Sequence, residues 1–93
     1  MKYIKIEWIH NVADEPVLLY SELDENNFEI RKVEIYSSGK RGYASKDKSV
    51  EGTELGLEKL PGFEEIKSDP QFKLTEVDKS DFESIWDEVV SGN

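Results

Sequence analysis

The sequence predicts one small α+β domain, in which an antiparallel meander sheet of four to five strands carries a C-terminal amphipathic helix on one face. Three observations predict it. Apolar and charged residues alternate near the N-terminus, short polar turns separate the next apolar runs, and residues 82–90 place apolar side chains at helical spacing. A chain of 93 residues suits a single domain over 1–93.

The first two strands follow from alternation and from turn residues. In residues 2–10, Ile4, Ile6 and Trp8 point to one face, while Tyr3 lies on the other, which we therefore expect to be partly covered. Pro16 opens a second strand through residue 23, at a position where a missing N–H does least harm.

The third strand, 28–36, changes phase along its length, which predicts a β-bulge near Arg31 and Lys32. The turn at Ser38 and Gly39 leads into a fourth strand at about 41–45, so the sheet is expected over about 2–45. Residues 46–61 are expected to be irregular, and a short helix is expected at about 63–68. The sheet is expected to have four strands, or five if residues 72–77 also form a strand.

The clearest element is a C-terminal helix at about 81–90. Ser80 and Glu83 have the spacing of a capping box at its start. Its apolar stripe is expected to cover the face of the sheet that carries Ile4, Ile6 and Trp8. The members of that stripe are Phe82, Ile85, Trp86, Val89 and Val90.

The net charge limits the classes of partner that the protein can attract. The chain carries −9, with twelve acids and four bases (net −8) in residues 49–93 against nine acids and eight bases (net −1) in residues 1–48. Such a field repels nucleic acid and anionic membranes and attracts cationic partners, although it also serves solubility alone. The absence of Cys and of any long apolar run predicts a cytoplasmic protein. No pattern indicates an oligomeric state.

Catalytic and metal-binding groups are scarce. One His and no Cys cannot fill a usual zinc site, and no nucleophile motif is present. The sequence therefore predicts no enzyme, no catalytic residue, no metal and no cofactor. His10 is interpreted as an edge histidine that binds a nearby loop, against a catalytic or pH-sensing alternative.

Exposed acids supply a candidate surface for a basic protein partner. With Phe82 and Trp86 facing inward, the outward positions of the C-terminal helix are acidic, and the short helix adds two further acids. Surface drift explains these positions equally well. The candidate residues are Asp81, Asp87, Glu88, Glu64 and Glu65.

The segments 3–10, 14–24 and 31–36 carry a resemblance that continues through 42–45 and the C-terminal helix. The chain resembles an uncharacterised family of small acidic bacterial proteins, a domain of unknown function whose first strand is similar to Tyr-Ile-Lys-Ile-Glu-Trp-Ile-His. The resemblance implies a bacterial origin and supplies no catalytic residues.

Two function hypotheses follow. The first is a non-enzymatic protein-binding module, in its sharpest form an immunity-type or antitoxin-like inhibitor of a basic partner; the analogy with acidic immunity proteins is one of class alone. The alternative is a small-molecule-binding or minor enzymatic domain, which requires Trp8, His10, Tyr20 and Tyr43 to converge on one pocket.

Overall fold

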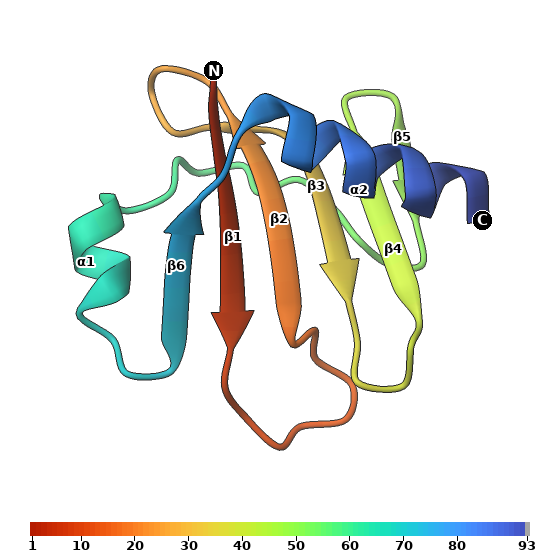
Figure 1. Cartoon of the computed structure of the whole chain (residues 1–93), viewed down its shortest axis with the longest axis horizontal. Helices are drawn as coiled ribbons and strands as arrows, with labels where there is room; N and C mark the ends of the chain where they lie inside the picture. The colour runs from red at the N-terminus through yellow and green to blue at the C-terminus, as the bar shows by residue number, and fades with distance from the viewer. Residues whose placement is uncertain (93) are drawn as a thin grey trace.

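The computed structural model describes residues 1–92 as an antiparallel sheet with one helix on its face and a second beside its edge (Figure 1). The helices are α1 (Phe63–Lys67) and α2 (Lys79–Gly92). The strands are β1 (Lys2–Trp8), β2 (Leu18–Leu23), β3 (Glu29–Ile35), β4 (Arg41–Ser45), β5 (Lys48–Val50) and β6 (Phe72–Glu76).

The sheet has six strands in the order β5-β4-β3-β2-β1-β6, and every neighbouring pair is antiparallel. The predicted α+β class, antiparallel sheet and sheet-packed C-terminal helix are confirmed. The predicted count of four to five strands is wrong. β6 pairs with β1 at one edge, and β5 lies inside the segment 46–61 that was expected to be irregular. Its three residues, with Val50 the only apolar one, are too few to show an alternation.

A β-bulge gives β3 its change of phase. Glu22 pairs with Arg31, whereas the next residue, Leu23, pairs with Glu29, so one extra residue of β3 lies between. The bulge is thus just before Arg31, close to the predicted position near Arg31 and Lys32. Because an extra residue moves the following side chains to the other face, Arg31 points toward α2 while Glu29 faces the other way.

α2 packs on the face opposite to the predicted one. Its Phe82 ring lies 5.5 Å from that of Tyr3, and its Trp86 ring lies 5.3 Å from that of Tyr43. Tyr3 and Ile4 are consecutive residues of a strand and therefore point to opposite faces. The expectation that α2 covers Ile4, Ile6 and Trp8 is wrong, because the aromatic partners of its stripe lie on the Tyr3 side.

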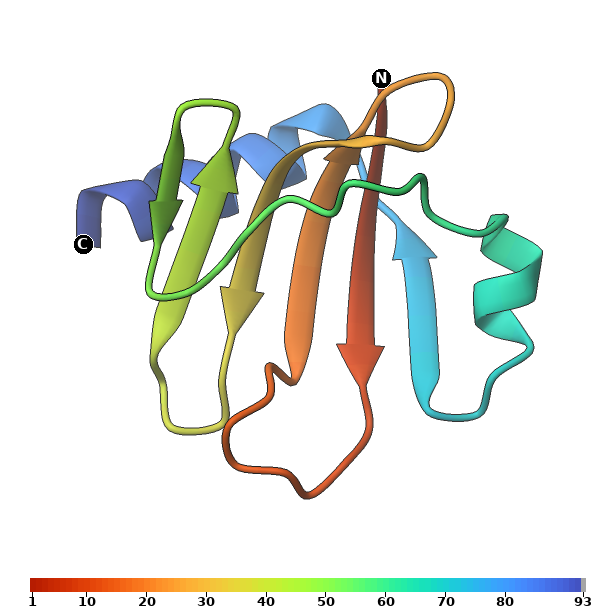
Figure 2. The ribbon, with the colours of Figure 1, turned by 180° about the vertical axis from the view of Figure 1, so that it is seen from behind.

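Residues 51–62 run across the face that carries Ile4, and α1 lies beside β6 at its edge, as the view from behind shows (Figure 2). Ile4, Leu23 and Leu74 are buried there, against Leu60, Phe63 and Ile66. Thr53 is fully buried, and its hydroxyl donates to Glu34 Oε1 at 2.9 Å. Residues 51–62 contain no helix or strand, yet they serve as the second cover of the sheet.

α2 begins at Lys79, earlier than the expected range of 81–90. Ser80 therefore lies inside the helix, and Phe82 N–H already donates to Asp78 O at 3.1 Å. The predicted capping box of Ser80 and Glu83 is wrong. Glu83 binds Arg31 of the sheet instead, since a tertiary ion pair replaces the local cap.

Gly42 permits the close approach of residues 51–62 to β4. A Cβ at this position would overlap Thr53 Oγ1 and lie 2.7 Å from the Val50 carbonyl oxygen. We expect Gly42→Ala to lower the free energy of unfolding by about 1–3 kcal/mol, measured by urea denaturation. Gly62→Ala, which meets no atom within 4 Å, is the matched control. Equal stability of the two variants would contradict this account.

Candidate functional site

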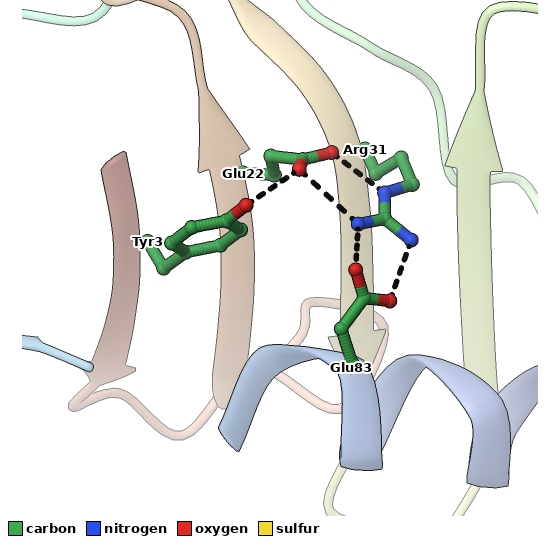
Figure 3. A network of polar contacts seen from close by, with 4 residues as sticks. All are labelled: Tyr3, Glu22, Arg31 and Glu83. Atoms are coloured by element: carbon green, nitrogen blue, oxygen red, sulfur yellow. Dashed lines mark hydrogen bonds and ion pairs between the residues drawn. The ribbon is translucent and has the colours of Figure 1, made fainter. Parts of the chain in front are cut away.

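The most connected polar cluster joins the sheet to α2 through Arg31 (Figure 3). Arg31 Nε and Nη2 donate to the Glu22 carboxylate at 2.6 and 3.1 Å. Arg31 Nη1 and Nη2 donate to Glu83 at 3.0 and 2.7 Å. One guanidinium is therefore held by two bidentate carboxylates, a geometry that lysine cannot reproduce.

Aromatic side chains complete this cluster. Tyr3 donates its hydroxyl proton to Glu22 Oε2 at 3.0 Å, and this hydrogen bond connects β1 to the Arg31 cluster (Figure 3). Arg31 Cζ lies 4.9 Å from the ring centre of Phe82 and 5.0 Å from that of Trp86. Arg31 thus contacts the sheet through the Glu22 carboxylate. It contacts α2 through the Glu83 carboxylate and through the rings of Phe82 and Trp86.

The electrostatics of the cluster follow from these contacts. The hydrogen bonds from Arg31 lower the pKa of Glu22 and of Glu83 below the ordinary 4.5. Burial, followed by the hydrogen bond to Glu22, raises the pKa of Tyr3 above 10.0. Near neutral pH both glutamates are therefore ionised and Tyr3 is neutral, which is the charge state in which every hydrogen bond of the cluster forms. The arrangement attaches α2 to the sheet.

His10 is bound at both ring nitrogens by the loop that follows β1. Val12 N–H donates to His10 Nδ1 at 2.9 Å, so the proton lies on Nε2, which donates to Pro16 O at 2.8 Å. The ring also stands edge-on to Trp8, with ring centres 4.4 Å apart. These contacts fix the orientation of the ring and order the loop between β1 and β2.

The four residues of the alternative pocket do not meet. Trp8 and His10 are neighbours, but Tyr20 pairs with Val33, which pairs in turn with Tyr43, on the face of α2. Trp8 has the opposite strand parity and points to the other face. Tyr43 is 4% exposed beneath Trp86. The structure therefore divides the candidate pocket between two faces of the sheet.

The five candidate acids form two patches rather than one. Asp81, Asp87 and Glu88 are exposed on α2, whereas Glu64 and Glu65 are exposed on α1. α2 lies across one face of the sheet, and α1 lies beside β6 at the edge (Figure 1). Glu88 approaches Arg41 at 3.8 Å and Glu64 approaches Lys67 at 3.5 Å, which leaves the other three acids without an ion pair in the described chain.

Within residues 1–92, no three His, Cys, Asp or Glu side chains gather in the way that a bound metal ion needs. Neither helix of this described part has the length and hydropathy to cross a bilayer.

Nearly the whole chain is similar to one protein family. A family described as a domain of unknown function, DUF6881, matches residues 2–91. The chain belongs to this family. No curated protein and no solved structure matches it. The resemblance to an uncharacterised family is thus confirmed, and the DUF6881 domain comprises both covers of the sheet as well as all six strands.

The Arg31 cluster of this DUF6881 domain was not predicted from the sequence. Its members come from three strands and a helix, with Arg31 and Glu83 separated by 52 positions. One signal pointed to it. Tyr3 occupies the supposedly polar side of β1, and the phase change before Arg31 moves a cation to that same side. The two together indicate a covered face with a charge that must be paired.

Removal of the guanidinium tests the role of the cluster. We expect Arg31→Met to lower the free energy of unfolding by on the order of 3 kcal/mol, because Glu22, with its side chain 9% exposed, keeps a buried charge without its partner. Lys67→Met, which removes the exposed partner of Glu64, should change the stability by less than about 0.5 kcal/mol. If the two variants lose the same free energy of unfolding in urea denaturation, Arg31 does not attach α2 to the sheet.

The depressed carboxylate pKa values give this loss a pH dependence. Glu22 and Glu83 stabilise the fold above their unfolded pKa near 4.5, and that contribution disappears as the pH falls through their lower folded values. The stability difference between the wild type and Arg31→Met should therefore be full at neutral pH and shrink below pH 4.5. Denaturant titrations at several pH values measure it, and a difference that stays constant into acid would contradict the assignment.

Proposed function

We propose that this DUF6881 domain is a non-enzymatic protein-binding module that masks a basic partner protein, in the manner of an immunity or antitoxin-type inhibitor. The single observation that carries the proposal is the net charge of −9, of which −8 comes from the half that contains both helices. A surface of this charge attracts cationic partners over long range and speeds their encounter. We place this activity in the cytoplasm.

The distribution of ion pairs supports a binding role for the free acids. Arg31 is neutralised by two glutamates within the domain, and Lys32 pairs with Glu29 at 3.1 Å. These cations are used for folding and do not offset the potential of the outer helix surface. Uncompensated negative charge therefore remains at the exposed side of α2.

The positions of acids along α2 support a contact at its outer side. Its last turn contains no basic residue, although Asp87 and Glu88 are located near the C-terminal end of the helix dipole. The negative end of the helix dipole does not favour carboxylates there, and Arg41 of β4 pairs with Glu88 at 3.8 Å. Acids kept at an unfavourable position, outward and unpaired in the case of Asp87, are what a site for a cationic surface requires. No placement of Trp8, Tyr20 or Tyr43 supports the small-molecule alternative.

The proposal predicts binding that depends on salt and on α2. A basic protein captured from native lysate at low ionic strength should bind more slowly as salt is raised, and association rates measured by surface plasmon resonance should fall steeply. Asp81→Asn with Asp87→Asn should slow association by about tenfold or more. Glu64→Gln with Glu65→Gln removes two charges from α1 and is the matched control.

Two outcomes would count against the proposal. Capture of no cationic protein at low ionic strength removes its main support. Equal effects of the α2 and α1 variants would mean that only the net charge matters and that α2 is not the contact surface.

A further inference from the structure

α2 covers only one end of the sheet face on which it lies. It contacts Tyr3 and Arg31, near the beginnings of β1 and β3, and Figure 1 shows no helix or loop over the other end of this face. The strand register assigns the side chains at that end: Lys5 pairs with Tyr20, and Glu7 pairs with both Leu18 and Lys73. Glu7 and Lys73 are exposed, whereas Lys5, Leu18 and Tyr20 are half-buried. We call these five residues, Lys5, Glu7, Leu18, Tyr20 and Lys73, the open floor.

The open floor carries two cations, one acid and two half-buried apolar side chains. A hollow of about 420 Å³ at its far end is lined by Glu7, Leu18, Lys73 and Ile9, among others, and Ile9 is 61% exposed. Lys5 Nζ lies 5.9 Å from the ring centre of Tyr20. Neither Lys5 nor Lys73 takes part in an ion pair within residues 1–92. An occupant of this floor should therefore be acidic and should cover apolar surface.

The outer side of α2 has the complementary chemistry. Asp81, Ser84, Asp87 and Glu88 are all exposed there. The serine is small, so the helix can approach another surface closely, and the acids match the cations of the floor. The same molecule therefore carries both halves of a charge-complementary contact.

The placement of these two halves allows a two-fold arrangement. α2 and the open floor lie side by side on one face of the sheet (Figure 1). A two-fold axis between them places α2 of each copy on the floor of the other, and such an interface is closed and self-complementary. We propose that the protein forms this homodimer, in which two sheets enclose a layer of two α2 helices.

The dimensions fit. α2 has 14 residues, which corresponds to a length of about 21 Å. The open floor lies on β6, β1 and β2, which span about 10 Å at a separation of about 4.8 Å. One helix is thus long enough to cross the three strands of the floor. The interface is small and partly electrostatic, so the dimer should be weakened by salt and by dilution.

Charge reversal on the floor tests the dimer directly. Sedimentation equilibrium of the purified protein over a concentration series should show a monomer–dimer equilibrium at low salt that shifts toward monomer at high salt. Lys5→Glu with Lys73→Glu reverses four charge contacts in a two-fold dimer and should raise the dissociation constant by about a hundredfold, roughly threefold for each contact. Lys46→Glu with Lys59→Glu makes the same change of net charge at exposed positions outside the floor and should raise it far less.

A rescue variant separates the contact from folding. Adding Asp81→Lys and Asp87→Lys to the reversed floor exchanges the two signs and should restore the dimer, while circular dichroism verifies that each variant is folded. A wild type that stays monomeric at low salt, or a control that weakens the dimer as much as the floor variant, overturns the proposal. The experiment uses the protein alone, so its failure leaves the proposed basic partner untouched, and failure to find such a partner leaves the dimer untouched.

Discussion

The attachment of α2 to the sheet depends on one largely buried cation, Arg31, whose side chain is 20% exposed. Arg31 links β3 to β2 through Glu22 and to α2 through Glu83, and its guanidinium lies against Phe82 and Trp86 of the helix. A buried charge is costly unless it is paired, so the position of each partner is constrained by the others. The rings of Phe82 and Trp86 also pack on Tyr3 and Tyr43 of the sheet, but apolar contact is not directional. The ion pairs of Arg31 add directional contacts between α2 and the sheet.

The β-bulge makes this arrangement possible. Without the extra residue before Arg31, the strand would present Arg31 and Glu29 to the same face. With it, Arg31 meets α2, while Glu29 faces the opposite cover and accepts a hydrogen bond from Gly56 N–H at 2.5 Å. One irregularity in β3 therefore supplies a polar anchor to each of the two covers of the sheet, α2 and residues 51–62.

The sequence predicted what local patterns encode and missed what long-range pairing decides. The alternation of Ile4, Ile6 and Trp8 identified β1, and the phase change located the bulge. The same alternation could not say which face α2 would cover, because Tyr3 on the other face is as apolar in its ring as the stripe requires. Glu83 was interpreted through its nearest neighbours as a cap, whereas its partner Arg31 is 52 positions away. The candidate acids were likewise recognised singly, and only the fold separates α1 from α2.

The two proposed associations compete for one surface. A basic partner and the open floor of a second copy both address the outer side of α2, so each would exclude the other at that helix. By mass action, a homodimer then lowers the fraction of α2 available and reduces the apparent affinity for the partner as the protein concentration rises. The net charge acts in the opposite direction: two copies at −9 repel at long range, whereas a cationic partner is attracted. A weak dimer would therefore keep its acidic helices covered until a basic protein arrives, and would yield to it because the long-range electrostatic term favours the heteromeric complex.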